Sequence, residues 1–85
     1  MTRSYPDFLK RLKAIGLHDA IEMRALKKYV SLRSLYEGPD MATSVIAARK
    51  DVYRWLVKRG RSVNEVARLF DRAPNGVWKM TRGKT

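Results

Sequence analysis

One stretch of the chain decides its fold, and it reads Arg61-Ser-Val-Asn-Glu-Val-Ala-Arg-Leu-Phe-Asp-Arg-Ala-Pro-Asn-Gly-Val-Trp-Lys-Met80. Ser62 and Glu65 have the spacing of a capping box, in which two residues satisfy each other's backbone N–H groups at a helix start. Apolar side chains then recur at helical spacing and predict one buried face: Val63, Val66, Ala67 and Phe70. The first part of the stretch is therefore expected to form a short helix.

The second part of the stretch predicts a tight turn and another short helix. Asp71-Arg72-Ala73 supplies the turn, and Asp tolerates the left-handed backbone conformation common in such turns better than most residues. Pro74 suits the first helical position, where its missing N–H costs nothing. Ala67 is small enough to let two helices cross closely, and Val77 would anchor the second helix. Together these features predict a helix-turn-helix, with an ordinary pair of packed helices as the alternative.

Three further helices are expected before this stretch, at about residues 6–14, 19–36 and 41–59. Asp19 and Asp40 have the residue type of N-caps for the second and third of them. The second carries a broad apolar stripe, formed by Ile21, Ala25, Leu26, Tyr29, Val30, Leu32 and Tyr36. The sequence therefore predicts an all-α fold, a small bundle of about five helices in one domain, 1–85. Residues 1–41 would serve packing or dimerisation, and residues 42–85 would hold the helix-turn-helix.

The charge of the chain is strongly positive and unevenly distributed. Nineteen Lys and Arg residues face eight Asp and Glu in 85 residues, a formal net charge of +11. Residues 42–85 carry most of this excess, which favours a polyanionic partner at the C-terminal half, although a merely solvated basic surface is the alternative. The absence of cysteine excludes a disulfide scaffold and a cysteine zinc site. No apolar run approaches the roughly 20 residues of a membrane span.

About half of the chain resembles a known DNA-binding family. Three segments carry the resemblance: Ala48-Arg49, the run Val52-Tyr53-Arg54-Trp55-Leu56, and residues 62–70. They are similar to the C-terminal domain of the bacterial replication initiator DnaA, a helical bundle of the Trp-repressor-like class. The family's signature run Arg-Asp-His-Thr-Thr corresponds to Arg72-Ala73-Pro74-Asn75-Gly76, which shares the arginine alone. The resemblance implies duplex DNA as partner, and a generic helix-turn-helix protein fits equally well.

In a helix-turn-helix, the N-terminal part of the second helix enters the major groove of DNA. Asn75 would face an adenine edge there, or be a solvated polar residue of the first turn, and Lys79 lies one turn further on the same side. Trp78 would contact DNA or pack against a neighbouring helix, and the start of the first helix would meet a phosphate. The residues expected to contact DNA are Arg49, Lys50, Arg54, Arg61, Ser62, Asn64, Arg68, Arg72, Asn75, Gly76, Trp78, Lys79 and Arg82.

These observations predict sequence-specific binding of double-stranded DNA by a small regulator of transcription or replication, cytoplasmic and associated with the nucleoid. A homodimer formed through residues 19–36 would suit a palindromic site. The alternative from another class is a basic adaptor that binds an acidic partner protein. His18 is the only histidine and has no catalytic arrangement around it, so we expect no enzyme, cofactor, metal site or small-molecule substrate.

Overall fold

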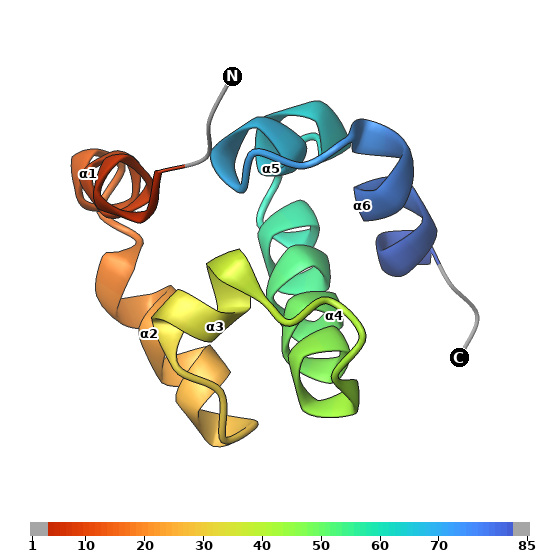
Figure 1. Cartoon of the computed structure of the whole chain (residues 1–85). Helices are drawn as coiled ribbons and strands as arrows, with labels where there is room; N and C mark the ends of the chain where they lie inside the picture. Colours follow the sequence, from red (N-terminus) through yellow and green to blue (C-terminus); the bar gives the residue numbers. More distant parts are fainter. Residues whose placement is uncertain (1–3, 83–85) are drawn as a thin grey trace.

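The computed structural model describes residues 4–82, which form six α-helices and no strand (Figure 1). The expectation of a small all-α bundle is confirmed. The helices are α1 (Tyr5–Ala14), α2 (His18–Lys27), α3 (Leu32–Glu37), α4 (Thr43–Lys58), α5 (Val63–Leu69) and α6 (Pro74–Arg82). Lys84, which adds to the C-terminal charge, lies outside the described residues.

The sixth helix arises because the segment expected as one helix over 19–36 is broken into α2 and α3. Tyr29 has a φ of 61°, a left-handed conformation that ends the helical path. Ser31 then caps a new helix, its hydroxyl accepting a hydrogen bond of 3.1 Å from the N–H of Ser34. The prediction of one continuous apolar stripe is therefore wrong in part, since Tyr29 is 97% exposed and Leu26 55% exposed.

Two predicted N-caps are also wrong. Leu17 stands at the N-cap of α2, where its carbonyl oxygen accepts from Ile21 N–H at 3.0 Å, and Asp19 lies in the first turn. Ala42 stands at the N-cap of α4 without a side-chain hydrogen bond. The carboxylate of Asp40 is turned away from this helix start and binds two arginines instead, Arg49 at 2.8 Å and Arg72 at 3.2 Å.

One hydrophobic core joins the two halves of the chain, and aromatic rings form its centre. Phe8 of α1 stacks on Tyr36 of α3 with ring centroids 4.3 Å apart, and it lies 5.1 Å from Phe70, next to α5. Tyr53 of α4 meets Phe70 edge-on at 5.0 Å. The long helix α4 lies between α2 and α6 and packs against both (Figure 1). The N-terminal helices therefore support the α5–α6 pair rather than forming a separate unit.

Candidate nucleic-acid interface

The start of α5 has the structure that the sequence predicts. Ser62 Oγ accepts a hydrogen bond of 3.1 Å from Glu65 N–H, and Glu65 Oε1 accepts one of 3.1 Å from Ser62 N–H. Val66 and Ala67 are buried on the inner face of the helix, and Val63 is half-buried. This capping box fixes the first turn of α5, whose N-terminal end faces solvent.

The connection between α5 and α6 is a tight turn that also follows the prediction. Asp71 has a φ of 55°, the left-handed conformation expected in this turn. The N–H of Arg72 donates a hydrogen bond of 2.8 Å to the carbonyl oxygen of Ala67. Pro74 begins α6, and Val77 is buried against the core. The two helices are thereby held in one relative orientation.

The side chains of this turn bind back to the N-terminal helices. The carboxylate of Asp71 accepts a hydrogen bond of 2.7 Å from Arg11 of α1 and another from the hydroxyl of Tyr36 of α3. Burial of the Tyr36 ring is the main cause that raises the pKa of the Tyr36 hydroxyl, and the hydrogen bond to Asp71 raises this pKa further. Arg72 donates to the carbonyl oxygen of Tyr36 at 2.6 Å and to Asp40 at 3.2 Å.

This arrangement corrects the position expected for Arg72. Its side chain is only 14% exposed and points into the protein. The guanidinium spans α3 and the loop that contains Asp40, because both the Tyr36 carbonyl and the Asp40 carboxylate lie within hydrogen-bond distance. Arg72 therefore fixes the turn, and the structure does not present it on the surface for a guanine or a phosphate.

Arg49 is likewise not on the exposed face of α4 where we expected it. The residue is 3% exposed and shares the buried stripe of the helix, at helical spacing from Val45 and Val52. Its guanidinium donates to the carbonyl oxygen of Leu35 at 2.8 Å and to the Asp40 carboxylate at 2.8 Å. The hydrogen bonds from Arg49, together with those from Arg72, lower the pKa of the Asp40 carboxyl. Arg49 thus joins α4 to α3.

Four of the expected contact residues do gather around one surface groove. It lies between the starts of α5 and α6, has a volume of about 430 Å³, and is lined by Ser62, Val63, Asn64, Pro74, Asn75 and Trp78. Gly76 and Lys79, two further expected contact residues, are exposed on α6. The ring of Trp78 is 46% exposed and carries the Arg82 guanidinium 4.3 Å from its centroid. No carboxylate lines this groove.

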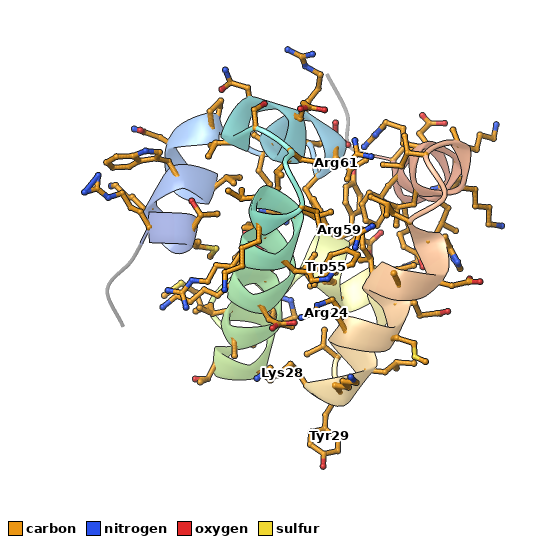
Figure 2. The ribbon with its side chains drawn as sticks, turned by 180° about the vertical axis from the view of Figure 1, so that it is seen from behind. Arg24, Lys28, Tyr29, Trp55, Arg59 and Arg61 are labelled. Atoms are coloured by element: carbon orange, nitrogen blue, oxygen red, sulfur yellow. The ribbon has the colours of Figure 1, made fainter. Side chains whose placement is uncertain are left out.

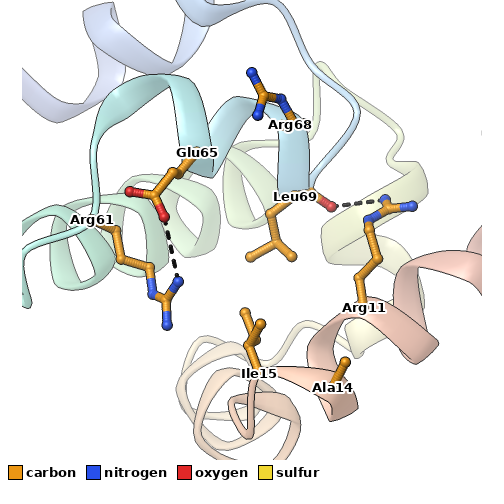
Figure 3. A pocket seen from close by; sticks show the side chains of 7 residues that line it. All are labelled: Arg11, Ala14, Ile15, Arg61, Glu65, Arg68 and Leu69. Atoms are coloured by element: carbon orange, nitrogen blue, oxygen red, sulfur yellow. Dashed lines mark hydrogen bonds and ion pairs between the residues drawn. The ribbon is translucent and has the colours of Figure 1, made fainter.

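The remaining expected residues lie on other faces. Arg61 and Arg68 belong to the side of α5 that faces α1, where they line a second groove with Arg11, Glu65 and an apolar floor (Figure 3). Arg54 is half-buried and donates to the carbonyl oxygen of Met80 at 3.2 Å, which ties α4 to the last turns of α6. Lys50 is exposed and lines a third groove, between α2 and α4. The predicted set therefore divides among three surfaces and the interior.

Sequence reasoning missed two groups of residues. One is the supporting network of Arg11, Tyr36 and Asp40, which no local pattern indicates because each lies more than 30 positions before the turn residue that it binds. The other is Arg24 of α2 with Lys28, the residue that follows this helix; both line a groove with Trp55 of α4 (Figure 2). Their spacing of four residues places both on one helix face, and this signal was present in the sequence.

Among residues 4–82, one group of side chains has the chemistry of metal ligands: His18, Asp19 and Glu22. His18 Nδ1 and the Asp19 carboxylate form a hydrogen bond of 2.9 Å, and the Asp19 side chain is 99% exposed. This hydrogen bond at the first turn of α2 accounts for the proximity of the two groups.

Comparison with protein-family models, with curated proteins and with solved structures finds no match to this chain. No helix within the described part of the chain combines the length and apolar character that crossing a bilayer requires.

Proposed function

We propose that the chain binds double-stranded DNA in a sequence-specific manner, with α5, the turn and α6 acting as a helix-turn-helix. The observation that carries the proposal is the groove between the starts of α5 and α6, where Ser62, Asn64, Asn75 and Trp78 meet without a carboxylate. Polar side chains, an exposed aromatic ring and two helix N-termini are the groups that contact base edges, sugars and phosphates in such motifs.

The exposed face of α6 supports insertion into the major groove. Asn75 and Lys79 are both exposed and lie one turn apart, so they point in the same direction. Asn75 near the helix start suits a bidentate contact with adenine, and Lys79 suits a base edge or a phosphate. Arg82, held over Trp78, would lie at the far end of the contact.

The hydrogen bonds that hold the turn between α5 and α6 also support DNA binding. Asp71 and Arg72 are held by side chains and carbonyl groups from α1, α3 and the loop before α4. A recognition helix held in one orientation loses little conformational freedom on binding, which favours affinity. Together with the resemblance to the DNA-binding domain of DnaA, this supports a regulator of transcription or replication. We propose that it is cytoplasmic and nucleoid-associated and acts without enzymatic activity or a cofactor.

Dimerisation through residues 19–36 remains part of the proposal. Three large apolar side chains of this segment are exposed: Met23, Leu26 and Tyr29. A second copy would cover them and give the two-fold symmetry that a palindromic site requires.

Selection of bound sequences from a pool of random duplexes tests this function. We expect enrichment of one site of defined length, and two-fold symmetry in the site if the protein is a dimer. Binding of the selected duplex should weaken steeply as salt increases, since phosphate contacts release counterions. Failure to bind any duplex at low salt would falsify the proposal.

The α1–α5 groove favours the second candidate, an adaptor for an acidic protein. Its floor is formed by Ala14, Ile15 and Leu69, and Arg11 and Arg68 stand at its edge (Figure 3). Two arginines of this groove are already paired, Arg61 with Glu65 at 3.6 Å and Arg11 with Asp71 at 2.7 Å. An acidic peptide with an apolar anchor residue would match this surface. Absence of duplex binding, combined with binding of an acidic amphipathic peptide that Arg68→Ala weakens, would support this alternative over DNA recognition.

A further inference from the structure

A strongly cationic groove lies between α2 and α4, apart from the groove between the starts of α5 and α6. Its volume is about 380 Å³, and five basic side chains line it against one carboxylate. Its lining consists of Arg24, Lys28, Ala47, Lys50, Asp51, Arg54, Trp55 and Lys58. By comparison, α6 carries only Lys79 and Arg82 as basic residues. This concentration of positive charge favours an anionic partner for this second surface as well.

The one carboxylate in this groove is already neutralised. Asp51 accepts a hydrogen bond of 3.2 Å from Arg24 Nε. Within residues 4–82, no ion pair or hydrogen bond engages the ammonium groups of Lys28, Lys50 and Lys58, all of which are exposed. Three ammonium groups are thus left to bind anions.

Trp55 organises the arginines beside this groove. The guanidinium carbons of Arg24 and Arg59 each lie 4.9 Å from the centroid of its ring. Figure 2 shows Trp55 between these two arginines, with Lys28 further along the same side of the molecule. Stacking on an aromatic ring restricts the guanidinium planes, so less freedom is lost when they bind phosphate oxygens.

The dimensions of the groove suit a nucleic-acid backbone. Lys50 and Lys58 are eight residues apart on α4, which corresponds to about 12 Å along the helix axis. That distance spans roughly three to four base-pair steps of a duplex at about 3.4 Å each. A single phosphate ion would not span the distance between Lys50 and Lys58, whereas a nucleic-acid backbone offers a phosphate at every step.

The groove is formed by residues of α4 and of the segment 24–28, and no residue of α6 lines it. Helix α4 stands between α2 and α6, and α2 makes no contact with α6 in the described part of the chain (Figure 1). The molecule measures 32 × 26 × 25 Å, comparable with the width of DNA. Bending a duplex of 20–30 base pairs through about 90° costs several kcal/mol. One straight duplex therefore contacts one of the two surfaces.

We infer that the groove between α2 and α4 binds the phosphate backbone of a second DNA duplex, so that one molecule bridges two duplex segments. The inference rests on the proposed function, in which α6 holds the first duplex. We take the second contact to be made to phosphate groups, which ammonium and guanidinium cations bind whatever the base sequence.

A capture assay tests the bridge with the full chain. Protein is bound to an immobilised duplex that contains the selected site, and capture of a second, fluorescent duplex of random sequence is measured. The groove variant Lys50→Glu with Lys58→Glu, both on α4 and outside the segment 19–36, is compared with Lys10→Glu with Lys13→Glu on α1, which changes the net charge equally. Lys13 and Lys58 both lie in the last turn of their helices, so the two variants disturb helix ends similarly. The urea midpoint verifies that each variant folds.

We expect the wild type and the α1 variant to capture the second duplex. The groove variant should capture at least tenfold less of it than the wild type does. Affinity for the selected site and its salt slope should stay the same in the groove variant. Capture that survives in the groove variant would overturn the inference, since bridging would then come from dimerisation. A salt slope lower by about 1.8, the value for two lost phosphate contacts, would also overturn it, since one duplex would reach both surfaces. If the wild type did not bind the selected duplex at all, the proposed function itself would be wrong.

Discussion

The guanidinium of Arg72, in the turn before α6, donates a hydrogen bond of 2.6 Å to the carbonyl oxygen of Tyr36 in α3. This contact spans 36 positions of sequence and joins the candidate DNA-binding helices to the N-terminal half. Arg72→Ala should therefore lower the free energy of unfolding by about 1 to 3 kcal/mol, because a carbonyl group beneath it loses a charged partner. Urea unfolding measures the change.

Arg68→Ala is the matched control for this prediction. Arg68 is exposed on α5, only four residues from Arg72, and its removal should change stability by less than about 0.5 kcal/mol. An equal effect of the two substitutions on stability would contradict the supporting role assigned to Arg72.

The turn residue Asp71 separates backbone preference from side-chain bonding. Its φ of 55° favours glycine, and relief of that conformation in Asp71→Gly would contribute up to about 1 kcal/mol. The same change removes the acceptor for Arg11 and Tyr36, and hydrogen bonds to a charged group contribute about 1.5 to 3 kcal/mol each. Because the Arg11 and Asp71 side chains are 35% and 34% exposed, solvent weakens their interaction. We therefore expect Asp71→Gly to be destabilising by about 1 to 2 kcal/mol in urea unfolding.

Asp71→Asn provides the comparison. It keeps a residue that tolerates the left-handed conformation and an acceptor oxygen, so it should be less destabilising than Asp71→Gly. A glycine variant more stable than the wild type would show that the contacts of Asp71 with Arg11 and Tyr36 contribute little.

The supporting network also predicts a pH dependence. Hydrogen bonds from Arg49 and Arg72 lower the pKa of Asp40 in the folded protein. The ionised carboxylate therefore contributes stability above its unfolded pKa of about 3.9, and that contribution is lost as pH falls through the lower, folded value. The difference in stability between wild type and Asp40→Asn should be greatest near pH 7 and shrink below about pH 4. Because this side chain is 54% exposed, the difference should not exceed about 1 kcal/mol.

Urea midpoints from pH 7 to pH 3 measure this difference, with Asp7→Asn on α1 as a control for the loss of one exposed carboxylate. A gap between wild type and Asp40→Asn that stayed constant over the whole range would mean that ionisation of Asp40 does not couple to folding.

These residues also show which parts of the structure the sequence could predict. The capping box of Ser62 and Glu65 and the left-handed Asp71 depend on neighbours within a few positions, and both predictions are confirmed. Arg49 was placed wrongly because its residue type indicates a surface position. Its helical spacing from Val45 and Val52 indicates the buried face of the helix. There the carbonyl group of Leu35 and the carboxylate of Asp40 accept its hydrogen bonds.

The candidate site divides along the same line. Local sequence could place Asn64, Asn75 and Trp78 near the start of one helix or the other, and packing in the core then brings them around one groove. The groove between α2 and α4 was not predictable as a unit, because it needs Lys28 and Trp55 from helices whose packing depends on the break at Tyr29. The sequence therefore indicates individual residues of the groove between α2 and α4, but it does not show that they lie close together.

The exposed apolar side chains of α2 give a prediction about assembly. If Met23 and Leu26 are covered by a second copy, the wild type should show the mass of a dimer in light scattering at micromolar concentration. Leu26→Lys should then give the mass of a monomer, because a charge in an apolar interface is costly to bury. Lys27→Ala, at the next position, should leave the dimer intact. A monomer mass for the wild type would rule out this interface.

Base recognition by α6 gives the last prediction. Asn75→Ala should weaken binding to the selected site by about 1 to 3 kcal/mol, roughly 5- to 150-fold, and random duplex by less than about threefold. The reason is that a contact with a base edge is lost while the phosphate contacts stay. Lys79→Ala should also reduce specific binding more than non-specific binding. Titration of both duplexes at one fixed salt concentration measures these ratios, with Lys13→Ala on α1 as the control. If Asn75→Ala kept the same preference among sequences, Asn75 would not be a base-reading residue, and recognition would reside elsewhere on the α5–α6 surface.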